Sequence, residues 1–357
     1  MVDTDYTQWE VGWHPDMRPF AAFVGDFLVK RMPPILHREQ EQLKMHKLSD
    51  SGQDPLGNGV VHATDTLMGR VLCMSGIYAL TWKQQERELS LWTFNTSWID
   101  QSIREAPKIP VAVAANLQHT IIDTSWIQRV SRARISADGA YALLHRFAGA
   151  QPAVLQVVDL KAGVAMPQKT MDLPKDVSAI AISPHGSEIL FVAGSVLHIY
   201  SMRNMKLLKI QTLASYNELS KRFSPTLACS PDGNKVWVTG RRGELWIYLL
   251  RTQKLEQMVA NKYCSGCSTP VFSGDGKRAV TASWGDDHDP TKRWIHVWNL
   301  NTYQTEVQIE LGDISPDWEP EVDISSGGKF LVATRNGQFV HVWDREMLLA
   351  KYAGAGS

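Results

Sequence analysis

The stretch that decides the fold runs from Cys229 to Tyr248 and reads CSPDGNKVWVTGRRGELWIY. Its Ser-Pro-Asp-Gly segment, 230–233, predicts a tight turn, because proline fixes φ and glycine accepts a positive φ. Residues 235–239 are rich in β-branched and aromatic side chains, which is typical of a short strand. After a second turn at 241–243, aromatic residues alternate in 244–248 and predict another strand. Together these segments form most of one four-stranded antiparallel sheet.

The same unit recurs along the chain. Its turns begin at positions 14, 66, 136, 183, 230, 273 and 325, so successive copies are 52, 70, 47, 47, 43 and 52 residues apart. The copies at 136, 183, 273 and 325 keep serine first and glycine fourth, whereas those at 14 and 66 are degenerate. A period of about 40–50 residues is typical of a propeller blade. The sequence therefore predicts an all-β fold, a seven-bladed β-propeller of four-stranded antiparallel blades.

Two of the copies end on a Trp-Asn or Trp-Asp pair, in Val297-Trp298-Asn299 and Val342-Trp343-Asp344. These endings and the turns resemble the WD40 and YVTN-like propellers over nearly the whole chain. The Gly-His pair that precedes the first strand in WD40 blades is absent from every copy, so the family's buried Asp-His-Ser-Trp network is not carried over. The resemblance implies a fold rather than a specific activity.

We expect a single domain over residues 1–357, because each blade packs only on its neighbours. The expected blades span about 9–48, 58–116, 117–169, 170–213, 217–260, 263–312 and 318–353. Residues 35–48 could form an outer strand or a surface helix, with the helix favoured, and the long second blade places its extra residues in 97–110. We expect 348–352 to form the outer strand of the last blade. The sequence leaves open whether residues 3–9 add to that blade.

Composition restricts the class of partner and the compartment. The chain has 37 Lys and Arg against 37 Asp and Glu, which disfavours nucleic-acid and membrane-surface binding. The acidic start has no charged-then-apolar signal, and the early apolar run 20–29 is too short to span a bilayer. Four cysteines give no disulfide framework. We therefore expect a cytoplasmic protein without membrane insertion.

Several motifs have a structural and a functional interpretation. Cys264-Ser-Gly-Cys267 lacks the second pair that a zinc site needs, so a plain turn is favoured. The acidic loop 286–289 could be a solvated loop, a partner contact or a cation site. His198, His296 and His341 occupy matching positions in different blades, which indicates a structural role.

No nucleophile, zinc-protease or phosphate-loop motif occurs, so the sequence predicts no catalytic residue, metal ligand or cofactor. The favoured function is an interaction scaffold that binds another protein. In the family that the chain resembles, loops joining the second and third strands share the top face with the connections between blades, and we expect partner contacts there. The residues concerned are Trp82, Arg241, Arg242, Asp286, Asp287, His288, Arg293, Trp318 and Arg335. The alternative is a lactonase-type enzyme, or a small-ligand binder, that uses the mouth of the central channel.

Overall fold

The structure is a computed structural model. It describes residues 7–10, 21–24, 27–32, 40–47, 63–68, 70–75, 78–83, 87–93, 111–112, 118–122, 130, 132–148, 151–174, 176–213, 225–240, 244–260, 266–284, 292–313, 320–335 and 339–354. The chain divides into two compact units, which are described separately. Unit 1 comprises residues 1–67, 94–117 and 263–357, and unit 2 comprises residues 68–93 and 118–262.

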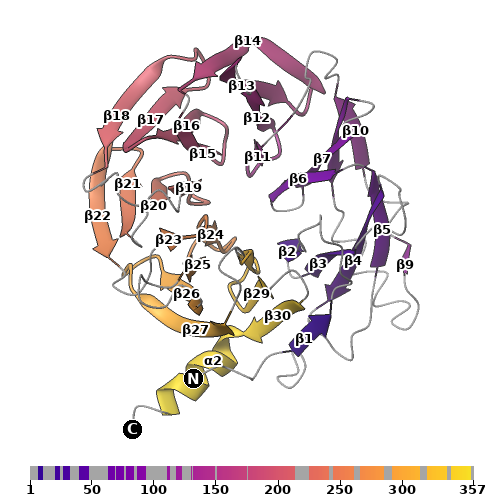
Figure 1. Ribbon diagram of the computed structural model, residues 1–357, viewed down its shortest axis with the longest axis vertical. Coiled ribbons are helices and arrows are strands. Elements are labelled where there is room, and N and C mark those ends of the chain that lie inside the picture. The colour runs from indigo at the N-terminus through magenta and orange to yellow at the C-terminus, as the bar shows by residue number, and fades with distance from the viewer. Residues whose placement is uncertain are drawn as a thin grey trace. The chain divides into compact units, whose positions relative to one another are not determined.

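Unit 2 consists of four antiparallel sheets of four strands each (Figure 1). Sheet 2 is built from β6 (Arg70–Ser75), β7 (Tyr78–Lys83), β8 (Glu88–Thr93) and β10 (Gln118–Ile122). Sheet 3 is built from β11 (Arg132–Ile135), β12 (Tyr141–Ala148), β13 (Gln151–Asp159) and β14 (Val164–Leu173). Sheet 4 is built from β15 (Val177–Ile182), β16 (Glu188–Ala193), β17 (Val196–Ser201) and β18 (Leu207–Thr212). Sheet 5 is built from β19 (Thr226–Cys229), β20 (Lys235–Thr239), β21 (Glu244–Leu249) and β22 (Lys254–Ala260).

The core of unit 2 lies between the faces of successive sheets. The first strands β6, β11, β15 and β19 contact one another in chain order. One hydrophobic cluster joins sheets 2 and 3, a second joins sheets 3 and 4, and a third joins sheets 4 and 5. Because both faces of sheets 3 and 4 pack on a neighbouring sheet, their central strands read as apolar runs such as Ile189–Ala193.

Unit 1 contains the remaining sheets. Sheet 1 is built from β2 (Ala21–Val24), β3 (Phe27–Met32), β4 (Gln40–Lys47), β5 (Ala63–Met68) and β9 (Val111–Ala112). Sheet 6 is built from β23 (Gly266–Cys267), β24 (Val271–Phe272), β25 (Arg278–Trp284), β26 (Lys292–Asn299) and β27 (Thr305–Asp313). Sheet 7 is built from β28 (Val322–Ile324), β29 (Phe330–Arg335), β30 (Phe339–Asp344) and β1 (Thr7–Glu10). Helix α2 (Arg345–Gly354) follows β30.

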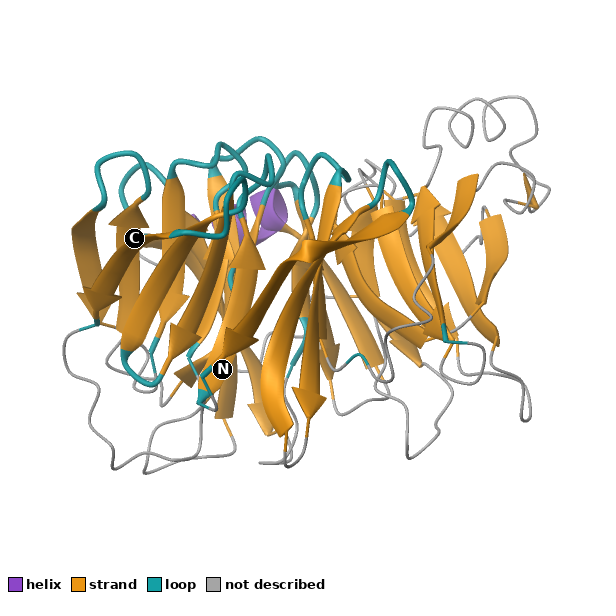
Figure 2. Cartoon of the chain, turned by 90° about the horizontal axis from the view of Figure 1, so that it is seen from above, coloured by secondary structure: helices purple, strands orange, loops and turns teal. Residues whose placement is uncertain are grey.

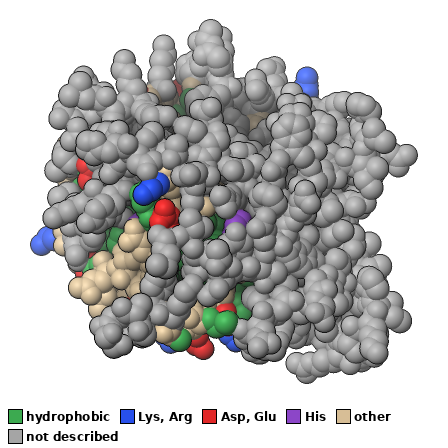
Figure 3. Space-filling model, turned by 60° about the horizontal axis from the view of Figure 1, so that its bottom comes forward, with side chains coloured by type: hydrophobic (Ala, Val, Ile, Leu, Met, Phe, Trp, Pro, Cys, Tyr) green, Lys and Arg blue, Asp and Glu red, His purple; other side chains and the backbone are tan. Residues whose placement is uncertain are grey.

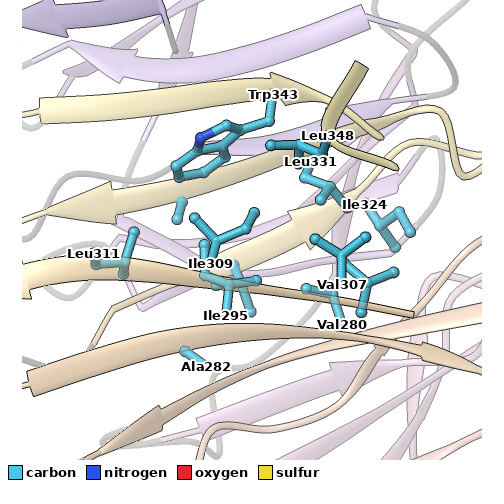
Figure 4. Packing of buried hydrophobic residues seen from close by; sticks show 13 residues of the cluster. Val280, Ala282, Ile295, Val307, Ile309, Leu311, Ile324, Leu331, Trp343 and Leu348 are labelled. Atoms are coloured by element: carbon cyan, nitrogen blue, oxygen red, sulfur yellow. The ribbon is translucent and has the colours of Figure 1, made fainter. Parts of the chain in front are cut away.

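Sheets 6 and 7 share one hydrophobic cluster, which helix α2 helps to cover. Figure 4 shows Trp343 of β30 and Leu348 of α2 on one side of this cluster, with Ile295 and Ile309 of sheet 6 on the other. All four side chains are buried. Helix α2 therefore contributes Leu348 to the core of unit 1.

The all-β fold is confirmed, as a propeller of four-stranded antiparallel blades. Strands make up most of the described chain in Figure 2, with one described helix. Six blades are recognised against the seven expected, although the described strands form seven sheets. Not every sheet is a regular blade: sheet 1 takes β9 as a parallel fifth strand beside β5, and sheet 6 also has a fifth strand. Turn spacing counts repeats, but it does not reveal such extra strands.

Three local expectations also need correction. The favoured helix within 35–48 is instead strand β4, in which Leu43 and Met45 alternate with polar residues at the period of a strand. Residues 348–352 belong to helix α2 and not to an outer strand, because β1 occupies that outer position. The second blade extends past 116 to β10, which pairs with β8.

The N-terminal strand completes the last sheet. Thr7 to Glu10 pair antiparallel with Val342 to Phe339, so β1 supplies the hydrogen-bonding partner for the edge of β30. This pairing answers the question that the sequence left open. No helix among the described residues is both long and apolar enough to cross a membrane.

Candidate interaction surfaces

The serine turns are structural. The Ser230 hydroxyl donates to Asp232 Oδ1 at 2.5 Å and accepts the backbone N–H of Lys235 at 3.0 Å. Gly233 adopts a φ of 69°, as its position in the turn requires. Partial burial alone would raise the pKa of the Asp232 carboxyl, but hydrogen bonds from Ser230 and Asn234 outweigh it and hold that pKa below its ordinary value. The turns at 136 and 273 repeat the same serine–aspartate bond.

These turns also join neighbouring sheets. A Cβ atom on Gly139 would lie 2.3 Å from the ring of Tyr78 in sheet 2, and one on Gly186 would lie 2.4 Å from the ring of Tyr141 in sheet 3. The backbone N–H of Asp138 donates to the carbonyl of Pro184 in the next turn, at 3.3 Å. The glycines therefore allow the aromatic side chain of one sheet to close over the turn of the next.

Buried polar side chains pair across the second and third strands. In sheet 6, Trp298 Nε1 donates to Thr281 Oγ1 at 2.9 Å, and His296 Nε2 lies 2.7 Å from Ser283 Oγ. Burial lowers the pKa of His296 to about 4, so its imidazole is neutral near pH 7. Sheet 2 repeats the tryptophan–threonine bond between Trp92 and Thr81. These bonds give buried polar side chains of the second and third strands hydrogen-bonding partners in both sheets.

Two of the predicted partner-binding residues are buried. Trp82 is 4% exposed and packs in the cluster between sheets 2 and 3, while Arg293 is 1% exposed in β26. The guanidinium of Arg293 donates from Nη1 to the carbonyl of Lys292 at 2.9 Å. Neither side chain therefore offers a surface to a partner.

The other predicted contacts lie outside the side chains that the structure describes. Arg335 ends β29, and only its backbone is described, paired with Phe339. The remaining residues, which lie outside the described part of the chain, are Arg241, Arg242, Asp286, Asp287, His288 and Trp318. The flanking strands place 241–242 between β20 and β21, and 286–288 between β25 and β26. Both segments are therefore second-to-third-strand connections, and their role in binding stays a prediction.

The described cysteines have the character of core residues. Burial raises the pKa of the Cys73 thiol to about 12, and it also raises the pKa of the Cys229 thiol. Cys267 is buried in β23, whereas Cys264 lies outside the described residues. Within the described part of the chain, no group of three or more His, Cys, Asp or Glu is placed to hold a metal ion.

A surface that the sequence analysis missed lies on β18, the last strand of sheet 4. Leu207, Leu208 and Ile210 are 45%, 45% and 49% exposed, and they are half of the six exposed large hydrophobic side chains found among the described residues. Figure 3 shows how described hydrophobic side chains reach the surface beside charged ones on one face. The signal in the sequence is the run 202–212, which holds three basic residues and no acidic one.

Position 208 has counterparts in two other sheets. The pairing of the third and fourth strands shifts by one residue at Leu208 in sheet 4, at Glu256 in sheet 5 and at Glu306 in sheet 6, which marks a β-bulge in each. Glu306 accepts hydrogen bonds from Asn299 at 2.8 Å and from Arg278 at 3.1 Å. In sheet 6 the bulge thus holds a charged network, whereas in sheet 4 it presents an exposed leucine.

Comparison with known proteins gives only a distant similarity. No family model matches the chain, and no curated protein sequence matches it. Among solved structures, the chain is similar to hydrazine synthase of Kuenenia stuttgartiensis, with 14% identity and a TM-score of 0.47, over 57% of this chain and 54% of that chain. The chain thus spans about half the length of that protein's chain, and the similarity assigns no function.

Proposed function

We propose that the chain is a WD40-like interaction scaffold in the cytoplasm, which binds another protein through the loops that join the second and third strands of its sheets. The observation that carries this proposal is the unequal length of those loops. Between β16 and β17 the connection is residues 194–195, whereas between β25 and β26 it is residues 285–291. The longer connection includes the carboxylates of Asp286, Asp287 and Asp289, together with His288.

Extra loop length has little effect on folding. Each doubling of a flexible loop costs about 0.6 kcal/mol, so the insertion is tolerated without being needed for stability. The turns and the buried polar pairs already hold the sheets, through bonds such as Ser230–Asp232 and Trp298–Thr281. A charged insertion on a rigid sheet is the usual way in which a scaffold presents a binding surface.

Shortening the insertion tests the proposal. Replacing residues 286–291 by Asn-Gly should keep the fold, because that pair suits a tight hairpin. The partner isolated with the wild-type chain should then bind the shortened chain at least tenfold more weakly. Asn301→Ala, in the exposed connection at the other end of β26, serves as the control and should bind normally. A shortened chain that binds as well as the wild type would contradict the proposal.

The alternative function has its own readout in the same preparation. Hydrolysis of a lactone by the purified chain, dependent on added Ca²⁺ or Zn²⁺, would favour a lactonase-type enzyme. Binding of a protein partner without such activity would favour the scaffold.

A further inference from the structure

We propose that the free edge of β18 is a second interaction site, at which an extended acidic segment of a partner protein adds as a further strand. This site lies on sheet 4 and does not use the loops of the proposed function. Sheet 4 ends at β18, and no described strand pairs with its outer edge. Strand addition to an open edge supplies main-chain hydrogen bonds, while side chains set the specificity.

The backbone of β18 has groups that point to this edge. On its inner side, Leu213 N–H donates to the Ser195 carbonyl at 2.9 Å. Hydrogen-bonded and non-bonded pairs alternate along an antiparallel ladder, so Lys209 and Gln211 bond toward β17. The backbone groups of Ile210 and Thr212 therefore face outward. An added strand would meet the N–H and C=O groups of Ile210 and the N–H of Thr212. It would share the Thr212 carbonyl with Gln211 Nε2, which donates to that carbonyl at 2.9 Å.

The side chains on β18 combine an edge charge with exposed apolar residues. Proteins usually blunt an open edge with lysine or other charged residues, proline, a β-bulge or a covering segment, and β18 has Lys209 and the bulge at Leu208. In β18 the bulge position carries Leu208, where the counterpart in β22 is Glu256. Leu208 and Ile210 are each close to half exposed, so a strand that covers them would bury apolar surface now in water.

Charge selects the chemistry of the partner. Arg203, Lys206 and Lys209 lie in the run 202–212, which contains no Asp or Glu. Pairing of two β18 edges would bring like charges together, which destabilises cross-strand neighbours. A second copy of this chain is therefore disfavoured, and a segment that alternates acidic with apolar residues is favoured.

Synthetic peptides test this proposal on the full chain. The probe is a capped seven-residue peptide in which valine and glutamate alternate, compared with the same peptide carrying lysine for glutamate. A third peptide keeps the glutamate sequence but is N-methylated at alternate residues, which removes the hydrogen bonds of one edge. We expect saturable binding of the first peptide only, measured by fluorescence anisotropy.

Charge reversal in the protein completes the test. Lys206→Glu combined with Lys209→Glu should weaken binding of the glutamate peptide about fivefold or more and should strengthen binding of the lysine peptide. The matched control is Lys161→Glu with Lys254→Glu, which makes the same charge change at exposed positions of unit 2. That control should bind the glutamate peptide like the wild type, and the melting temperatures should confirm that both variants fold.

Three outcomes would overturn the proposal. The first is no saturable binding of the glutamate peptide up to about 1 mM. The second is equally tight binding of its N-methylated form. The third is a loss of affinity for the glutamate peptide in the control variant as large as that in the Lys206→Glu, Lys209→Glu variant. The chain with residues 286–291 shortened should bind the peptide normally. Failure of the loop site and failure of the β18 site are therefore distinguished by separate measurements.

Discussion

At the scale of single residues, the turns owe their shape to one serine and one glycine. Ser230 closes its turn with hydrogen bonds to Asp232 and Lys235, and Gly233 takes the positive φ of 69°. These interactions are local in sequence, which is why the pattern Ser-Pro-Asp-Gly predicts them well. The conformation of Gly233 gives a direct test.

Gly233→Val should destabilise the fold by about 1–3 kcal/mol, because a β-branched residue is strained at positive φ. A Cβ atom there would come no closer than 3.6 Å to Pro184, so the loss measures backbone strain rather than a clash. Urea unfolding checks this, with Gly327→Val as the control, since that glycine faces open space without a positive φ. Partner binding by the folded Gly233 variant should not change. Equal stability of the Gly233 variant and the wild type would contradict the assigned turn.

The buried His296 predicts a dependence of stability on pH. Burial lowers its pKa from 6.5 to about 4, so the unfolded chain binds a proton more readily than the folded chain between these values. The free energy of unfolding therefore has its full value above pH 6.5 and falls by on the order of 3 kcal/mol as the pH drops toward 4. His296→Gln should show a smaller loss in urea midpoints over this range. An unchanged slope in His296→Gln would be inconsistent with a neutral buried imidazole.

At the scale of elements, the sheets are interlocked where an aromatic ring meets a glycine. Gly139 and Gly276 share a φ of 65°, but a Cβ atom on Gly139 would enter the ring of Tyr78, whereas one on Gly276 would meet nothing within 4 Å. Gly139→Ala should therefore cost about 1–3 kcal/mol more than Gly276→Ala, the usual cost of overpacking. Thermal unfolding of the two variants gives the comparison. Equal losses would show that sheets 2 and 3 do not meet at this turn.

Which parts of the elements could be predicted depends on the range of the interactions. The central strands and turns follow from neighbouring residues, as in 229–248. The pairing of β1 with β30 and of β9 with β5 joins distant segments, so no local sequence pattern predicts either pairing. Residues 348–352 do not form the expected outer strand for the same reason: the distant strand β1 pairs with β30, and these residues belong to helix α2.

The site residues show the same limit. Trp82 and Arg293 were expected at the surface because they lie near loops, yet their burial depends on how far each strand extends and on the packing around it. The apolar edge of β18 was missed because exposure cannot be read from residue type alone. Its basic run 202–212 was visible, but nothing local indicates that β18 ends its sheet.

At the scale of the whole molecule, the repeated sheets account for the composition of the chain. Apolar residues fill the spaces between successive sheets, and the buried polar groups described above pair across strands. Far-UV circular dichroism should be dominated by strand, with helix well below the share of about one third that is ordinary for globular proteins. A helix content above that share would contradict the all-β fold.

Cross-linking of the partner-bound chain tests whether a partner protein binds at the second-to-third-strand connections. Lys292 begins β26 beside the insertion, whereas Lys277 lies in the turn at the other end of the same sheet. Amine-reactive cross-linking followed by mass spectrometry should give partner cross-links to Lys292 and none to Lys277. Partner cross-links at Lys277 without any at Lys292 would place the interface on the serine turns and contradict binding at the second-to-third-strand connections.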